Sequence, residues 1–342
     1  MRSLDGYMRG IDLGGWFSQC DHREETYSNF IKEEDFARIR DWGLDHVRLP
    51  VDIELFETRD GQRIESGFAH LQRAMDWAEK YGLNLVLDLH KTYGYSFDVG
   101  EKEAGFFHDE ALQERFCAIW EELARRYGNL HDRVAFELLN EVTDPADGPL
   151  WNAIAARCIA RVRRIAPETW ILIGGYWNNS ISALKDLDPP ADDRIVYNFH
   201  CYDPVMFTHQ GAYWVAGMDR NYRLPITVTY RRLAEDTERV IGRKATGMEI
   251  FDPDEMLSAA YFEHSMAEAV RVAEERNVPL YCGEYGVINL ADPQDTVAWY
   301  RMIHQAFEKY GIGRAAWSYR KMDFGLVDEH ADPVREELIS LL

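Results

Sequence analysis

Residues 134–142 read Val-Ala-Phe-Glu-Leu-Leu-Asn-Glu-Val, an almost continuous apolar run that ends in an amide and a carboxylate. Such a run is typical of a strand buried on both faces of a parallel sheet. In a barrel of these strands, catalytic groups lie at the carboxyl ends, and Asn140 and Glu141 occupy that position. A lone Asn-Glu pair could equally be the cap of a following helix, because Asn is a favoured N-cap residue.

A second apolar segment ends in the same way and favours the catalytic interpretation. Residues 278–286 read Val-Pro-Leu-Tyr-Cys-Gly-Glu-Tyr-Gly and deliver Glu284 to the end of a strand. Cleavage of a glycosidic bond requires one proton donor and one carboxylate on the other face of the sugar. The sequence therefore predicts that Glu141 and Glu284 face one another as a catalytic pair.

Strand-like and helix-like segments alternate along the whole chain. The expected strands are Met8–Leu13, His46–Pro50, Asn84–His90, Val134–Asn140, Trp170–Gly174, Ile195–His200, Val278–Glu284 and Ala315–Tyr319. Amphipathic helices are expected between them, such as Phe68–Tyr81, which keeps one apolar face and is followed by the C-cap residue Gly82. Eight alternations in 342 residues predict an α/β protein, a single (β/α)8 TIM barrel over residues 1–342.

One interval is too long for a simple connection between strands. Residues 203–254, between the sixth strand and the sixth helix, contain several aromatic residues and leave a strand at its carboxyl end. We expect a small lid-like insertion subdomain on the catalytic face. A solvated insertion with no role in ligand binding is the alternative, because long loops are thermodynamically well tolerated.

Charge and composition limit the possible partners. The formal net charge of -21 makes nucleic acid an unlikely partner, since phosphate binding needs clustered Lys and Arg, and it suits a neutral substrate. Five widely spaced cysteines with no Cys-x-x-Cys favour neither a disulfide framework nor a zinc site. No apolar run has the length of a signal peptide or membrane span, so we expect no membrane association and a cytoplasmic protein, or a secreted one with its signal removed. We also expect a monomer without cofactor or metal.

Polar and aromatic residues gather at the ends of the other predicted strands: Arg48, His90, His200, Tyr202 and Trp317. Each alone is more simply a surface ion pair, a core histidine or a packing residue. Their joint appearance at the same end of successive strands indicates one site.

Together with Asn140-Glu141 and Glu284, this set resembles glycoside hydrolase family 5, the cellulase family of retaining enzymes. The resemblance extends from Gly14-Gly15-Trp16 to Met322-Asp323-Phe324. Three runs, 45–50, 136–142 and 280–284, are most similar to the clostridial endoglucanase C type within that family. The resemblance implies a β-glucan polysaccharide or oligosaccharide as substrate.

The resemblance also implies roles for the residues. Glu141 would be the general acid/base, with its pKa raised by burial and by the charge of Glu284, and Glu284 the nucleophile, kept ionised by Arg48. Tyr202 would donate a hydrogen bond to Glu284, and Asn140 would hold the sugar 2-hydroxyl. His90 and His200 would line the reacting subsite, and Trp317 would offer a flat apolar face to a pyranose ring.

The chain departs from the family pattern after the third strand, where Lys91 stands in place of a second histidine found in many members. The contacts on the non-reducing side are therefore open. Trp16, Trp177 and Trp214, near strand ends or in the insertion, are candidate stacking platforms for further sugars.

Three functions fit these residues. The first is a retaining endo-β-1,4-glucanase acting on cellulose-like or mixed-linkage glucans. The second is a β-mannanase or β-1,3-glucanase on the same scaffold, because the loops and not the two glutamates select the sugar. The third is a non-catalytic sugar-binding barrel, which the intact set of polar residues disfavours. A metal-dependent barrel hydrolase is weaker still, because Ile11-Asp12-Leu13 stands where a His-x-His motif would end the first strand.

Overall fold

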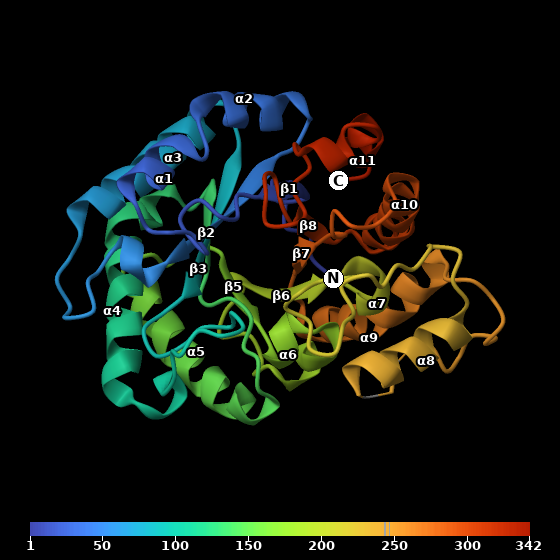
Figure 1. Ribbon diagram of the computed structural model, residues 1–342. Helices are drawn as coiled ribbons and strands as arrows, with labels where there is room; N and C mark the ends of the chain where they lie inside the picture. The colour runs from blue at the N-terminus through green and yellow to red at the C-terminus, as the bar shows by residue number, and fades with distance from the viewer. Residues whose placement is uncertain (243, 246) are drawn as a thin grey trace.

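Eight short parallel strands pair in chain order, and β8 pairs with β1 to close the barrel. The computed structural model describes residues 1–242, 244–245 and 247–342. The strands are β1 Arg9–Asp12, β2 His46–Asp52, β3 Asn84–Lys91, β4 Val134–Glu137, β5 Ile171–Gly174, β6 Ile195–Cys201, β7 Leu280–Tyr285 and β8 Gly313–Ala316. Figure 1 shows the strands in the centre with the helices around them, so the predicted TIM barrel is confirmed.

The helices form the outer layer. They are α1 Glu24–Asn29, α2 Glu33–Asp41, α3 Glu65–Lys80, α4 Glu110–Tyr127, α5 Gly148–Arg163, α6 Tyr176–Asn179, α7 Val205–Thr208, α8 Tyr230–Ile241, α9 Ala259–Arg276, α10 Pro293–Tyr310 and α11 Arg335–Ser340. On α3, Phe68, Leu71, Met75 and Ala78 are buried, as their spacing predicts. Among the described residues, no helix combines the length and apolar character of a membrane span.

The strand that carries the first glutamate is shorter than predicted. β4 ends at Glu137, and only Phe136 and Glu137 pair with β5, which starts at Ile171 opposite Phe136. Residues 138–140 still run between their neighbours, because Leu138 N donates to Leu172 O and Asn140 N to Leu89 O. Asn140 is therefore no helix cap, since α5 begins only at Gly148.

The long interval after β6 contains α7 and α8, and α8 lies at the periphery beside α9 (Figure 1). This part has apolar packing of its own, in which Tyr230 stacks on Phe251 with ring centroids 4.5 Å apart. Its first residues pack next to the barrel mouth, where His209 contacts Tyr202 and Phe324.

Candidate active site

The register of the barrel brings the two glutamates and their neighbours to one end. His200 on β6 pairs with Glu284 on β7 across a bulge at Gly283. Gly283 is required there, because a Cβ would lie 2.7 Å from Asn198 Oδ1 and 2.9 Å from His200 Nε2. The bulge therefore allows Glu284 and His200 to stand at the same height in the barrel.

Arg48 contacts four acidic side chains at this end of the barrel. Its guanidinium makes a two-pronged interaction with Glu137, at 2.7 and 2.8 Å. It also donates to Asp12 and Glu284 at 2.9 Å each, and lies 2.9 Å from Asp88. The side chain of Arg48 is fully buried, so all of its binding capacity is used inside the protein.

One guanidinium cannot neutralise four buried carboxylates, and the pKa values show this. Burial raises the pKa of Asp12 well above its usual range, although Arg48 acts against the shift. Burial likewise raises the pKa of Asp88 to about 7 and raises that of Glu137. Asp12, Asp88 and Glu137 therefore bind protons more tightly than ordinary carboxylates.

Glu141 lies beyond the end of β4, in a left-handed backbone conformation with φ 28°. Its Oε2 accepts a hydrogen bond from Asn178 Nδ2 at 2.8 Å, and its Oε1 lies 2.7 Å from His200 Nδ1. Burial raises its pKa to about 7, against the hydrogen bond from Asn178, and the carboxylate of Asp98 adds to the rise. Glu141 can therefore hold a proton near neutral pH, as a general acid must.

Glu284 accepts two hydrogen bonds, one at each carboxylate oxygen. Arg48 Nη1 donates to Oε1, and the Tyr202 hydroxyl donates to Oε2, each at 2.9 Å. One oxygen of Glu284 lies within 4.8 Å of one oxygen of Glu141. This close approach favours the short carboxyl spacing of retaining glycosidases, roughly 5–5.5 Å, over the roughly 6.5–9.5 Å of inverting enzymes.

The same grouping, with a ring nitrogen of His200, has the donor atoms of a metal site. Both oxygens of Glu284 already accept hydrogen bonds, and the Arg48 cation stands against one of them. A positively charged neighbour opposes a second cation, so these residues suit a proton-transfer site better than a metal site.

His90 and Trp317 form one wall of the site. Their rings are parallel, with centroids 5.8 Å apart. Gly14 makes room for the indole, because a Cβ at that position would meet Trp317 at 2.6 Å. Phe97, on the loop after β3, packs edge-on against His90 with centroids 4.8 Å apart.

The side-chain nitrogen of Asn140 is a hydrogen-bond donor without a partner among the described residues. Its Oδ1 accepts from Arg48 at 2.9 Å, whereas its buried Nδ2 has no hydrogen-bond partner among the described residues. A buried, unpaired amide is unfavourable unless a ligand satisfies it. Asn140 Nδ2 is therefore suited to donate a hydrogen bond to a substrate hydroxyl.

The three candidate stacking tryptophans lie in different surroundings. The prediction for Trp16 is wrong, because its side chain is fully buried, stacks on Phe17 and donates from Nε1 to Tyr27 O. Trp177 is 48% exposed and follows β5. Trp214 is half-buried in a cluster with Trp317, next to the site.

The ammonium of Lys91 is surrounded by carboxylates. It donates hydrogen bonds to Glu101 at 2.9 Å and Asp98 at 3.0 Å, and it lies 3.6 Å from Asp52. Gln19 donates to Asp98 at 2.7 Å. Lys91 therefore holds the loop that carries Phe97 through Asp98 and Glu101.

Sequence reasoning missed Asn178, Asn179 and Phe97. Phe97 lies in a loop without periodicity, so nothing in the sequence around it points to the site. A signal for the asparagines was present, because two polar residues follow the fifth strand as they follow the others. Their contacts with Glu141 and His200 depend on a backbone turn that the sequence pattern does not reveal.

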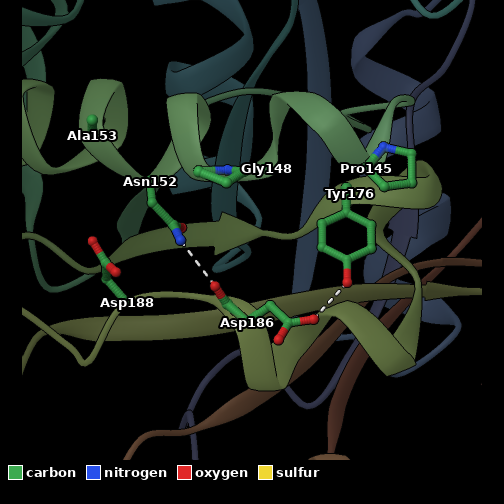
Figure 2. Close-up of a pocket in the computed structure, with 8 residues that line it drawn as sticks. Pro145, Gly148, Asn152, Ala153, Tyr176, Asp186 and Asp188 are labelled. Carbon is green, nitrogen blue, oxygen red and sulfur yellow. Dashed lines mark hydrogen bonds between the residues drawn. The ribbon is translucent and has the colours of Figure 1, made fainter.

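A separate cavity of about 520 Å³ lies at the rim, between the start of α5 and the segment after β5. Figure 2 shows Tyr176 pointing toward Asp186, with which it forms a hydrogen bond, and Asn152 bonded to the same segment. The strand-end residues do not line this cavity.

Known proteins resemble this chain over most of its length. Residues 9–323 match the family model for cellulase, glycosyl hydrolase family 5. Cellodextrinase A of Ruminococcus flavefaciens is 46% identical over 92% of this chain and 86% of its own length. Endoglucanase C of Acetivibrio thermocellus is 38% identical over 98% of both chains. The structure of Thermotoga maritima Cel5A with mannotriose has a TM-score of 0.74 and 25% identity, covering 98% of this chain and 97% of that one.

Proposed function

The chain belongs to the cellulase family, glycosyl hydrolase family 5, and we propose that it is a retaining endo-β-1,4-glucanase acting on cellulose-like or mixed-linkage β-glucans. The observation that carries this proposal is the pair Glu141 and Glu284, with carboxyl oxygens within 4.8 Å at the barrel mouth. The names of the two relatives, an endoglucanase and a cellodextrinase, support β-1,4-linked glucose as the substrate.

In the first step, Glu284 attacks the anomeric carbon while Glu141 gives its proton to the glycosidic oxygen, which leaves. In the second step, Glu141 takes a proton from water, and the water oxygen displaces Glu284 from the anomeric carbon. The raised pKa of Glu141 suits the first role, and the donors Arg48 and Tyr202 suit the charge on Glu284. The free Nδ2 of Asn140 supports a bond to the sugar 2-hydroxyl.

Two tryptophans are candidates for sugar-binding subsites. Trp317, beside His90, is suited to stack on the reacting sugar. Trp177 precedes the residue that binds Glu141, so it is placed for a sugar on the leaving-group side. We further propose that residues 203–254 form a subdomain that extends the cleft through Trp214, which packs against His209 and Phe324.

A second candidate is preferential action on short cello-oligosaccharides. The loop held by Lys91 stands beside the reacting subsite through Phe97, where it would limit the room for long chains. Cellodextrinase A, at 46% identity, supports this candidate.

A panel of substrates assayed for reducing ends tests both candidates. It includes carboxymethylcellulose, a mixed-linkage glucan, mannan, a β-1,3-glucan and cello-oligosaccharides. We expect activity on the β-1,4-glucans and release of a β-anomer, seen by NMR during the first minutes. Activity confined to mannan or to the β-1,3-glucan, or release of the α-anomer, would contradict the proposal. Cleavage of oligosaccharides alone would favour the second candidate.

A further inference from the structure

Three consecutive residues after β5 adopt a left-handed backbone. Trp177, Asn178 and Asn179 have φ of 50°, 56° and 53°. Residues with side chains avoid this conformation, and Asn tolerates it best after Gly. Strain of this kind persists where the surrounding structure holds it and is concentrated at functional sites.

The turn brings two asparagines to the same glutamate. Asn178 N donates to Val142 O at 3.0 Å, which fixes the turn beside Glu141. Asn178 Nδ2 then donates to Glu141 Oε2 at 2.8 Å. Asn179 Nδ2 lies 3.4 Å from His200 Nε2, while His200 Nδ1 faces Glu141 Oε1. One asparagine therefore contacts Glu141 directly and the other reaches it through an imidazole.

The glycine at the end of β5 allows this arrangement. A Cβ on Gly174 would lie 2.2 Å from Asn179 Oδ1. The position must therefore lack a side chain for Asn179 to reach His200.

Two neutral side chains contact the Glu141 carboxylate directly: Asn178 at Oε2 and His200 at Oε1. The titratable groups around Glu141 are Arg48, Asp88, His90, Tyr95, Asp98, His200, Tyr202 and Glu284. Burial lowers the pKa of His200 to about 4, so its imidazole is neutral at working pH and carries one proton. The hydrogen bond from Asn178 opposes the effect of burial on Glu141.

We propose that Asn178 is a positioning residue that sets the proton balance of Glu141 in the double displacement. Its amide stabilises the carboxylate that exists after the proton has moved to the leaving group. The same bond keeps Glu141 ready to accept the proton of the attacking water in the second step. The inference rests on the proposed function, because it assigns Glu141 both halves of the proton cycle.

Two substitutions remove the donor at position 178 with residues that are compatible with the left-handed turn. Asn178→Gly removes the amide, and Asn178→Asp replaces it with an acceptor of the same shape; both residues tolerate positive φ. Loss of a donor to a carboxylate raises its pKa, so the alkaline limb of kcat/KM on cellohexaose should move up by about one pH unit in Asn178→Gly. The limb should move further in Asn178→Asp, because a like charge adds to the shift. The acidic limb should stay in place.

Asn178→Ala distinguishes the effect of the amide donor from the effect of backbone strain. Alanine lacks the donor and is also strained at φ 56°. It should show the same shift of the alkaline limb as Asn178→Gly, with a lower Tm. An unmoved limb in both Asn178→Gly and Asn178→Asp, or a downward movement in Asn178→Asp, would overturn the inference. So would a rise in KM with an unchanged pH profile, because that result identifies Asn178 as a substrate contact.

A measurement without substrate tests the role of Asn178 independently of the proposed function. The carboxyl carbon of Glu141 can be followed by 13C NMR in glutamate-labelled protein and assigned with Glu141→Gln. We expect its titration midpoint to rise in Asn178→Gly and more in Asn178→Asp. If the wild type cleaves none of the β-glucans, the proposed function fails, and an unchanged midpoint would still refute the control of Glu141 by Asn178.

Discussion

Arg48 Nη1 donates to Glu284 Oε1 at 2.9 Å, and both side chains are buried. The same guanidinium binds Glu137 with two further nitrogens. The group that holds the charge of the proposed nucleophile is therefore also a structural element of the barrel core. Catalysis and stability depend on one side chain here.

Arg48→Lys should consequently destabilise the protein, because an ammonium cannot make the two-pronged bond to Glu137 and still reach Asp12 and Glu284. Leaving buried carboxylates unpaired is expected to cost roughly 3–5 kcal/mol in the free energy of unfolding. Denaturant titration at pH 7 measures this loss. Arg126→Lys is the matched control, since Arg126 binds Glu65 with two nitrogens at the surface and should lose less than about 1 kcal/mol. Equal losses in the two variants would contradict the central role of Arg48.

The raised pKa of Glu141 predicts both a rate profile and a stability profile. Because the acid must be protonated, kcat/KM should fall as pH rises through about 7. For stability, the folded pKa lies above the ordinary value of 4.5, so the folded state binds more protons between these values. The contribution is present below pH 4.5 and is lost as pH rises to about 7, by roughly 3 kcal/mol.

Glu141→Gln should remove this contribution of Glu141 to the pH dependence of stability. Wild type and variant, compared by unfolding at pH 4.5 and pH 8, should differ in favour of the variant at the higher pH. Other buried acids such as Asp88 titrate in both proteins and cancel in the comparison. A difference that does not change with pH would show that burial has not raised the pKa of Glu141.

The two glutamates should respond differently to removal. Glu284→Ala is expected to abolish formation of the glycosyl-enzyme on every substrate. Glu141→Ala should still be glycosylated by a dinitrophenyl cellobioside, because that leaving group departs without a proton. Azide should rescue its second step, measured as release of the phenol and of a glycosyl azide. Identical behaviour of the two variants, without rescue, would reverse or remove the assigned roles.

The tryptophans should separate into packing and binding residues. Trp16→Ala is expected to lower the free energy of unfolding by about 3–5 kcal/mol, because the ring is fully buried. Trp177→Ala should leave stability within about 0.5 kcal/mol and raise KM for cellohexaose more than for a short aryl glycoside. Trp214→Ala should share this preference for long substrates. An equal loss on both substrates, with a lower Tm, would place Trp214 among the packing residues.

Lys91 should act through the loop that it holds. Lys91→Met keeps the length and apolar stem but removes the cation that binds Asp98 and Glu101. We expect Phe97 to lose its fixed place and KM for cello-oligosaccharides to rise roughly tenfold, equal to about 1.4 kcal/mol, with kcat almost unchanged. Lys91→Arg, which keeps the charge, should restore most of the affinity. A fall in kcat alone would indicate a direct role for Lys91 in the chemistry.

The sequence by itself determined the barrel and the two glutamates. Eight apolar segments alternating with amphipathic helices leave few other architectures, because each helix must cover a buried parallel strand. Strand ends share one face of a barrel, so Arg48, His90, His200 and Glu284 could be placed together before any contact was known. These are consequences of local periodicity, which a sequence displays directly.

Only the tertiary structure decided which side chains fill the core and which contacts set the protonation of the acids. Trp16 and Trp177 both lie near strand ends, yet Trp16 is buried against Phe17, whereas Trp177 is exposed. Asn178 contacts Glu141 because three residues take a left-handed turn that the sequence pattern does not predict. The pKa of Glu141 depends on burial and on partners distant in the sequence, such as Asn178, and those distances exist only once the chain has closed the barrel.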